Sequence, residues 1–259
     1  MNGALLSAQT GLEAQNLRMQ FISNNLANSE TTGYKSTSPE FAALMTLRLR
    51  EPSSAEGAAS GGLQVGTGVQ TIGSVTDFGQ GAPVETKRSL DIMINGDGFI
   101  PVLKEDGTRI FTRGGSFNID ADGRIVTLEN YALDPEITVP DNAESILIAK
   151  DGVVEVKTAD SDELTEIGQL EIVKFLNQNG LRILEGGYYE KVVDASGDEM
   201  IGTADEDGYG AFMQGYKESS NVNTINELVN MINAQRGYEM SAKAMTAAGD
   251  MMSTLNNAV

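Results

Sequence analysis

Apolar residues recur at helical spacing over the first 28 residues of the chain. The stripe comprises Leu5, Leu12, Met19 and Leu26 at intervals of seven, with Ala8, Gln15 and Ile22 at the alternate three-four positions. Residues spaced in this way share one face of an α-helix, so the stripe predicts a long helix. The Asn, Ser and Thr residues that follow favour side-chain bonds to the backbone over helix, and Gly33 permits a positive φ. We therefore expect the helix to end near Asn28 in a sharp turn.

The apolar period changes to two in the middle of the chain. Short alternating segments predict strands at residues 63–69, 90–94, 98–103, 109–112, 116–119, 124–127, 137–139, 145–148, 153–157, 168–175 and 188–193. Asp-Gly pairs that begin at Asp97, Asp106, Asp122, Asp151 and Asp207 predict tight turns. Many short strands joined by close turns indicate an antiparallel β body rather than a parallel sheet with crossover helices.

Helical spacing returns near the C-terminus. Thr224 and Glu227 fit a capping box that starts this helix. Its main stripe comprises Leu228, Met231, Gln235, Tyr238, Ala242, Met245, Gly249 and Met252, and a second row comprises Ile225, Val229 and Ile232. The predicted fold class is therefore α+β, with two long terminal helices packed side by side as a coiled-coil-like pair and a mainly antiparallel β body between them.

The change of pattern along the chain predicts four parts. Residues 1–35 carry the N-terminal helix, residues 36–75 a linker and extended connecting segment with a small-residue stretch at 51–62, residues 76–216 a β-rich body, and residues 217–259 the C-terminal helix. An acidic subdomain is expected at about residues 141–210, where seventeen acids stand against five bases.

Composition excludes several kinds of chemistry. The chain has no cysteine and no histidine, which removes disulfides, thiolate catalysis, Ser-His-Asp triads and His-based zinc sites and leaves carboxylates as the main catalytic candidates. The net charge is −19, of which residues 47–216 carry −17. Such acidity argues against nucleic acid or an anionic membrane as a partner. No apolar run is long enough to span a membrane, and the N-terminus does not read as a secretory signal peptide.

Two acidic clusters invite a metal or catalytic hypothesis. The stretch from Asn118 to Glu129 nearly fits an EF-hand loop. Its flanks are strand-like where that motif needs helices, so we expect a β-hairpin turn at Asp122-Gly123. Asp205-Glu206-Asp207 is expected to be a solvated loop. We predict no catalytic residue, no cofactor and no metal site.

Both terminal helices carry more apolar surface than one helix–helix seam uses. Leu6, Leu17 and Phe21 lie off the main stripe of the first helix, as the row Ile225, Val229 and Ile232 does on the second. An isolated two-helix hairpin, which is the alternative, would leave these side chains in water. Because large exposed apolar patches mark interaction surfaces, the pattern favours self-association through the ends of the chain.

Several long stretches carry recognisable motifs. They are Ile22-Ser-Asn-Asn-Leu-Ala-Asn-Ser-Glu-Thr-Thr-Gly-Tyr-Lys35, Leu90-Asp-Ile-Met-Ile-Asn-Gly-Asp-Gly-Phe99, Phe111-Thr-Arg-Gly-Gly-Ser-Phe117, Gln214-Gly-Tyr-Lys-Glu-Ser-Ser-Asn-Val-Asn223 and Val229-Asn-Met-Ile-Asn-Ala-Gln-Arg-Gly-Tyr-Glu-Met240. These stretches resemble the bacterial flagellar axial proteins, the rod and hook family. Gly62-Leu-Gln-Val-Gly-Thr-Gly-Val69 resembles a segment typical of the distal rod type.

The resemblance implies a structural subunit of the flagellar distal rod in the basal body. Such a subunit is exported by the flagellar type III apparatus without a cleaved signal peptide. It stacks helically with copies of itself into a hollow drive shaft, which crosses the periplasm and transmits torque from motor to hook. The terminal helices line the inner tube and the β domains lie outside. Proximal rod and hook proteins adjoin the ends of the polymer, and the P and L rings surround it.

The implied protein is not an enzyme, binds no nucleic acid and is not membrane-embedded. The expected assembly interface comprises Leu5, Leu12, Met19, Ile22, Asn24, Asn25, Leu26, Asn28, Gly33, Tyr34, Val222, Ile225, Leu228, Val229, Met231, Ile232, Gln235, Arg236, Tyr238, Met245 and Met252. The alternatives are a proximal rod or hook subunit of the same family or, from a different class, an acidic calcium-binding β protein or a carboxylate hydrolase.

Overall fold

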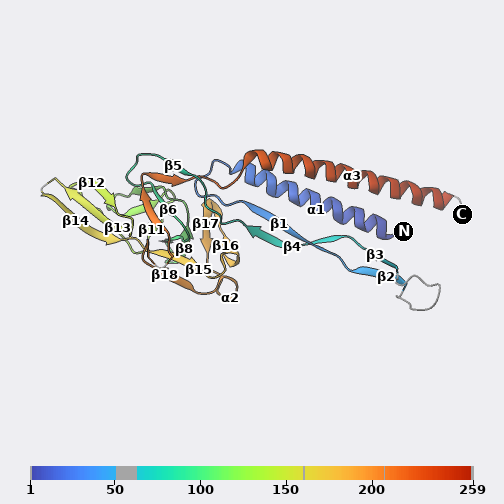
Figure 1. Ribbon diagram of the computed structural model, residues 1–259, viewed down its shortest axis with the longest axis horizontal. Helices are drawn as coiled ribbons and strands as arrows, with labels where there is room; N and C mark the ends of the chain where they lie inside the picture. The colour runs from blue at the N-terminus through green and yellow to red at the C-terminus, as the bar shows by residue number, and fades with distance from the viewer. Residues whose placement is uncertain (1, 51–62, 160, 207, 258–259) are drawn as a thin grey trace. The chain divides into compact units, whose positions relative to one another are not determined.

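The computed structural model describes residues 2–50, 63–159, 161–206 and 208–257. The chain forms two compact units, each made of separate stretches (Figure 1). Unit 1 comprises Met1–Ala27, Thr37–Thr76 and Asn223–Val259, and unit 2 comprises Asn28–Ser36 and Asp77–Val222. The small-residue linker expected at 51–62 lies outside the described residues, and the four-part division of the chain stays a prediction.

Unit 1 holds the long helices and two antiparallel strand pairs. Its elements are α1 (Asn2–Ala27), β1 (Thr37–Ala43), β2 (Thr46–Arg50), β3 (Leu63–Gly66), β4 (Val69–Thr76) and α3 (Thr224–Asn257). Strand β1 pairs with β4, and β2 pairs with β3. The backbone N–H of Val69 donates to Thr10 Oγ1 at 3.3 Å, which fixes the start of β4 to α1. Helix α1 therefore packs against β1 and β4 as well as against α3.

The expected coiled-coil-like pair of terminal helices is wrong. The structure has one long N-terminal helix and a C-terminal helix with a large antiparallel β body. Leu228 and Tyr238 of the predicted α3 stripe are exposed. Where α1 and α3 approach, small or polar residues meet: a Cβ added to Gly11 would lie 3.3 Å from Ser241 Oγ. Small side chains allow this close approach.

The helix ends follow local side-chain chemistry. Helix α1 ends at Ala27, directly before the polar run, which confirms the predicted stop. The predicted capping box on α3 is one residue out of place. Asn223 Oδ1 accepts hydrogen bonds from the backbone N–H groups of Ile225 and Asn226, both at 3.1 Å. Asn223 is therefore the N-cap, in keeping with the preference of asparagine for that position.

Unit 2 is the antiparallel β body. Its strands are β5 (Pro83–Glu85), β6 (Ile92–Asn95), β7 (Ile100–Leu103), β8 (Arg109–Thr112), β9 (Phe117–Ile119), β10 (Ile125–Thr127), β11 (Ala132–Leu133), β12 (Ala143–Ile148), β13 (Val153–Thr158), β14 (Ser161–Gln169), β15 (Ile172–Phe175), β16 (Arg182–Ile183), β17 (Tyr188–Glu190), β18 (Glu199–Gly202), β19 (Ala211–Gln214) and β20 (Tyr216–Glu218). Short helices occur at η1 (Gln178–Gly180), η2 (Glu185–Gly187) and α2 (Val193–Ser196).

The described residues of unit 2 form five sheets. The largest has the strand order β16-β17-β8-β7-β11-β10-β9, a second has the order β12-β13-β14, and β15-β18, β19-β6 and β20-β5 form pairs. The main core includes the buried side chains of Ile110, Phe117 and Phe212. A second cluster is aromatic, with the ring centroids of Phe111 and Phe175 4.8 Å apart.

Most predicted strands are confirmed with shifted ends, but three segments differ. Residues 63–69 belong to two strands, because β3 ends at Gly66 and β4 begins at Val69. Residues 168–175 also belong to two strands, because β14 ends at Gln169 and β15 begins at Ile172. Residues 137–139 contribute only a bridge between Thr138 and Arg124. The alternation of apolar and polar residues does not show where the backbone changes its pairing partner, so the sequence did not separate these cases.

Candidate assembly interface

The predicted stripe on α1 is only partly covered within unit 1. Ile22 is buried, whereas Leu5, Leu12, Met19 and Leu26 keep intermediate exposure. Leu6, beside the stripe, is exposed. Helix α1 therefore keeps accessible apolar surface along most of its length.

Two adjacent asparagines near the end of α1 differ in their surroundings. Asn24 is exposed and Asn25 is buried. Asn25 Nδ2 donates to the carbonyl of Thr37 at 2.9 Å, and Asn25 Oδ1 accepts from the N–H of Thr37 at 3.0 Å. This reciprocal bond satisfies both backbone groups of Thr37, as a neighbouring strand would. Within the single chain, Asn25 thus joins the last turn of α1 to the start of β1.

The turn after α1 belongs to unit 2. The backbone N–H of Thr31 donates to the carbonyl of Asn28 at 3.1 Å, and the N–H of Gly33, at φ 70°, donates to the carbonyl of Glu218 at 2.8 Å. A Cβ on Gly33 would lie 2.9 Å from the carbonyl of Arg113. The carbonyl of Tyr34 accepts from the N–H of Asn221 at 3.3 Å. Asn28, Gly33 and Tyr34 therefore have a folding role inside unit 2.

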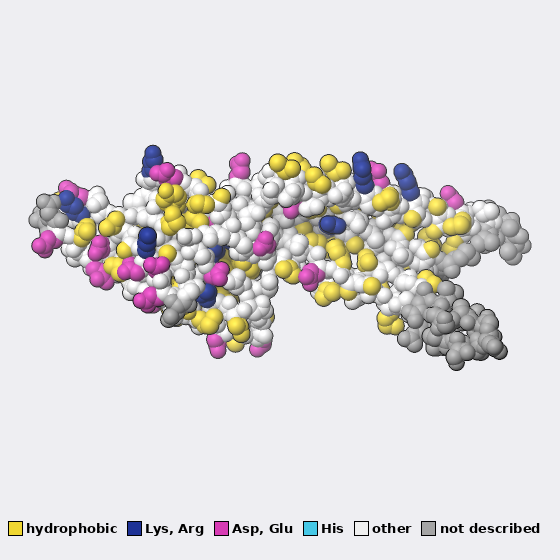
Figure 2. Space-filling model, in the orientation of Figure 1, with side chains coloured by type: hydrophobic (Ala, Val, Ile, Leu, Met, Phe, Trp, Pro, Cys, Tyr) yellow, Lys and Arg dark blue, Asp and Glu magenta, His cyan; other side chains and the backbone are white. Residues whose placement is uncertain are grey.

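Helix α3 presents an apolar row to solvent near its start. Ile225 is 71% exposed, Val229 52%, Ile232 50% and Leu228 48%. At about 100° per residue, the row lies roughly opposite the buried Ala234 and Ala248. Figure 2 shows hydrophobic side chains gathered over this first part of α3. We call Ile225, Leu228, Val229 and Ile232 the α3 row.

The other predicted interface residues are spread around α3 and the segment before it. Met231 and Met245 have intermediate exposure, as Val222 has in unit 2, whereas Gln235, Arg236, Tyr238 and Met252 are exposed. The structure therefore brings together the α3 row as one continuous surface, and it does not place all the predicted residues on one face.

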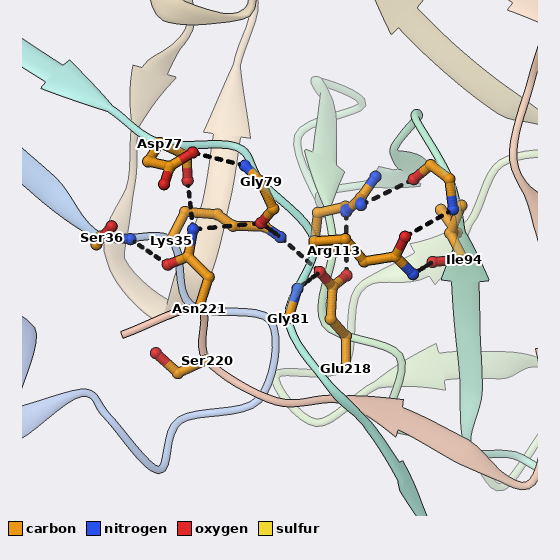
Figure 3. Close-up of polar contacts among 12 residues, drawn as sticks. Lys35, Ser36, Asp77, Gly79, Gly81, Ile94, Arg113, Glu218, Ser220 and Asn221 are labelled. Atoms are coloured by element: carbon orange, nitrogen blue, oxygen red, sulfur yellow. Dashed lines mark hydrogen bonds and ion pairs between the residues drawn. The ribbon is translucent and has the colours of Figure 1, made fainter. Parts of the chain in front are cut away.

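A buried charged network in unit 2 was not predicted (Figure 3). Glu218 Oε1 lies 2.5 Å from Lys35 Nζ, and Glu218 Oε2 lies 3.2 Å from Arg113 Nε. The side chains of Lys35, Glu218 and Arg113 are 0%, 1% and 5% exposed. Burial lowers the pKa of Lys35 below its ordinary value, and its hydrogen bond with Glu218 opposes that shift. The network therefore depends on the carboxylate of Glu218.

Backbone groups complete the network. Lys35 Nζ donates to the carbonyl of Gly79 at 2.8 Å, and Arg113 Nη2 donates to the carbonyl of Gly96 at 2.9 Å. Glu218 Oε1 also accepts from the N–H of Gly81 at 2.8 Å. The only sequence signal was that Lys35 and Glu218, of opposite charge, each lie in a terminal motif. Their separation of 183 residues gave no reason to pair them.

Three family models match the chain. The model for flagella basal body rod protein matches residues 5–35, the model for the D1 domain of flagellar hook protein FlgE/F/G matches residues 93–156, and the model for the C-terminal part of flagellar basal body rod FlgEFG protein matches residues 213–258. The predicted α1 stripe lies in the first match, and the α3 row lies in the third.

Full-length relatives share one description, flagellar basal-body rod protein FlgG. The relative from Buchnera aphidicola subsp. Acyrthosiphon pisum is 40% identical over 256 residues, 98% of each chain. Those from Agrobacterium fabrum and Bacillus subtilis are 37% and 31% identical, again over 98% of each chain. The chain belongs to the FlgG family of flagellar basal-body rod proteins. It is therefore a structural subunit of the flagellar distal rod.

The FlgG-family body carries the EF-hand-like stretch as a hairpin, as predicted. Strand β9 pairs with β10, and the turn between them has Gly123 at positive φ. Asp120 Oδ1 accepts from the N–H groups of Asp122 and Arg124 at 2.9 and 2.8 Å, and Asp120 Oδ2 accepts from Arg124 Nε at 2.8 Å. Desolvation raises the pKa of Asp120, but these bonds outweigh it and lower the pKa below its ordinary value. Both carboxylate oxygens are thus used within the loop.

We expect no Ca²⁺ binding of sensor affinity, about micromolar, at residues 118–129. A calcium ion would have to displace the bonds from Arg124, a fixed positive charge, to reach Asp120. Isothermal titration calorimetry of the wild type and of Asp120→Ala measures this. A micromolar site in the wild type that disappears in Asp120→Ala would contradict the expectation and favour the calcium-binding alternative.

The remaining acidic cluster and the helices give no further site. Of the predicted loop at 205–207, Asp207 lies outside the described residues, and Asp205 adopts φ 65°. Within the part of the chain that the structure describes, no three acidic side chains group as metal ligands. No described helix is both long and apolar enough to cross a membrane.

Proposed function

We propose that copies of this chain polymerise helically through unit 1 into a hollow rod that transmits torque across the periplasm from motor to hook. The observation that carries the proposal is the α3 row, four large apolar side chains about half exposed or more. Full burial of one such side chain is worth roughly 1.5–3 kcal/mol. A contact between unlike surfaces of successive copies repeats without closing and generates a helical filament.

The charges of the two units support this division of roles. By residue count, unit 1 has seven acids and five bases, a net charge of −2, and unit 2 has thirty acids and thirteen bases, a net charge of −17. Near-neutral surface is cheaper to bury against a copy of itself, whereas like-charged surfaces repel each other. We therefore assign the inner contacts to unit 1 and the outer, solvated layer to unit 2.

The wider assembly follows from the family. We propose that proximal rod and hook proteins adjoin the ends of the polymer, that P and L ring proteins surround it, and that the flagellar type III apparatus exports the chain without a cleaved signal peptide. We also propose that the chain is not an enzyme, because its relatives are described as rod proteins.

The substitution Val229→Asp tests the proposal. The carboxylate would have to be buried in each repeated contact, at a cost of several kcal/mol per subunit. In the single chain Val229 is exposed, so the fold should be unaffected. We expect a folded monomer with an unchanged unfolding midpoint and no polymer, as measured by electron microscopy, sedimentation and thermal unfolding.

Asn233→Asp is the matched control. It adds the same charge to α3 at an exposed position outside the α3 row, so polymers should still form. If Val229→Asp polymerised as the wild type does, the α3 row would not be part of the interface. A large fall in the unfolding midpoint of Val229→Asp would show instead that the row packs inside the single chain.

A further inference from the structure

Strand β20 carries two adjacent charges of opposite sign into different surroundings. It pairs with β5 in the register Tyr216 to Glu85, Lys217 to Val84 and Glu218 to Pro83. Consecutive side chains of a strand point to opposite faces, so Lys217 and Glu218 meet different groups. Glu218 enters the cationic site formed by Lys35 and Arg113 (Figure 3).

Lys217 meets a buried carboxylate. Lys217 Nζ lies 3.4 Å from Asp91 Oδ2, and Arg88 Nη1 lies 3.7 Å from Asp91 Oδ1. The side chain of Asp91 is 0% exposed, and neither oxygen has a hydrogen-bond partner among the described residues. A buried carboxylate with no hydrogen bonds relies on nearby cations, so Asp91 selects a positive charge at the position of Lys217.

We propose that Lys217 and Glu218 form a charge-coded latch that sets the register of β20 and closes unit 2. A slip of one residue in one direction would place Lys217 against Lys35 and Arg113. A slip in the other direction would place Glu218 against Asp91. Both errors bring like charges together in buried sites, and fixing register is the best-attested use of buried charges.

The latch also joins distant parts of unit 2. Ser36 N–H donates to Asn221 Oδ1 at 2.8 Å, and Asn221 Nδ2 donates to the carbonyl of Asp77 at 2.7 Å. The stretch 33–36, the stretch 77–98 and Arg113 are thus held together by residues 218–221, near the end of unit 2 in the sequence. Unit 2 therefore cannot complete its fold until that segment is in place. This inference concerns a single chain and does not rest on the proposed polymer.

Disulfide trapping in the full chain reports the register. The chain has no cysteine, and Glu85 and Tyr216 are directly opposed, so Glu85→Cys with Tyr216→Cys should cross-link only in the native register. In this background we exchange the latch charges with Lys217→Glu and Glu218→Lys, which leaves the net charge unchanged. We expect the rate of cross-linking to fall at least about tenfold and amide exchange across β5, β6 and β20 to accelerate at least about 100-fold.

The control exchange is Arg182→Glu with Glu190→Arg, an opposed pair on β16 and β17 whose side chains are 63% and 31% exposed. It should leave the cross-linking and amide-exchange rates as they are in the parent. A variant with Lys217→Met removes the charge that opposes one of the two slips, so cross-linking should slow several-fold as β20 samples the slipped register. It keeps the charge of Glu218, so the sheets of unit 2 away from β20 should stay protected. If the double exchange does not fold, Lys217→Met alone tests the latch. Parental cross-linking rates in Lys217→Met, or in a folded double exchange, would overturn the latch.

Discussion

Replacing Glu218 by alanine is expected to lower the free energy of unfolding of unit 2 by about 3–5 kcal/mol. Glu218 is the carboxylate shared by Lys35 and Arg113, and all three side chains are buried. The truncation leaves two buried cations without this counter-charge, and it also removes the acceptor of Gly81 N–H. Urea denaturation of the full chain, followed by a probe in unit 2, measures the loss.

Glu190→Ala is the control for this prediction. Glu190 Oε2 pairs with Arg182 Nη1 at 2.9 Å, but the two side chains are 31% and 63% exposed. Exposed ion pairs contribute about 0–1 kcal/mol, so the control should lose little. Equal and small losses in both variants would mean that the network adds nothing beyond an exposed pair.

The loss of unfolding free energy caused by Glu218→Ala should become smaller as the pH rises. Burial lowers the pKa of Lys35, and the opposing hydrogen bond with Glu218 is gone in the variant. Unfolded lysine titrates near pH 10.4, at about its ordinary pKa. Between the folded pKa and this value the unfolded state holds a proton that the folded state does not, so stability rises with pH. A loss that stays constant between about pH 7 and pH 10 would contradict this account. Recovery should be partial, because Arg113 also loses its ion pair with Glu218 in the variant.

Gly115→Ala should destabilise unit 2 by about 3 kcal/mol or more, at the upper end for overpacking. A Cβ at this position would lie 1.6 Å from the carbonyl oxygen of Ile92. The same backbones are joined by the bond from Ile92 N–H to the carbonyl of Gly115, at 2.8 Å. Relief of the clash must therefore move β6 away and break this bond. Thermal or urea unfolding of the full chain measures the effect.

The neighbouring Gly114 supplies the matched control. A Cβ on Gly114 would meet only Thr112 Oγ1, at 3.3 Å, within 4 Å. That contact is with the movable end of a side chain, so Gly114→Ala should change the free energy of unfolding by less than about 1 kcal/mol. Similar losses for Gly114→Ala and Gly115→Ala would show that the segment between β8 and β9 tolerates no side chain at either position, and that the contact with Ile92 is not decisive.

Local features of the fold were predictable because neighbouring residues determine them. The end of α1 at Ala27 follows from the polar run that begins after it, and the hairpin at Asp122-Gly123 follows from turn chemistry. The motifs around Ile22 and Phe111 indicated the family, which the full-length relatives confirm. The site was predictable only in part. The α3 row followed from a surplus of apolar residues, but its exposure depends on which face of α3 is covered within unit 1.

The sequence by itself determined the two long helices, the hairpin turn at Asp122-Gly123, the antiparallel character of the body and the family, since each depends on spacing or on a continuous motif. The tertiary structure alone decided which distant residues meet. Lys35 and Glu218 pair across 183 residues, and Gly115 needs to be glycine only because β6 passes beside it. The helix contact was decided in the same way, since an apolar stripe does not reveal what will cover it. Only the folded chain shows the close approach at Gly11 and Ser241 and the exposure of the α3 row.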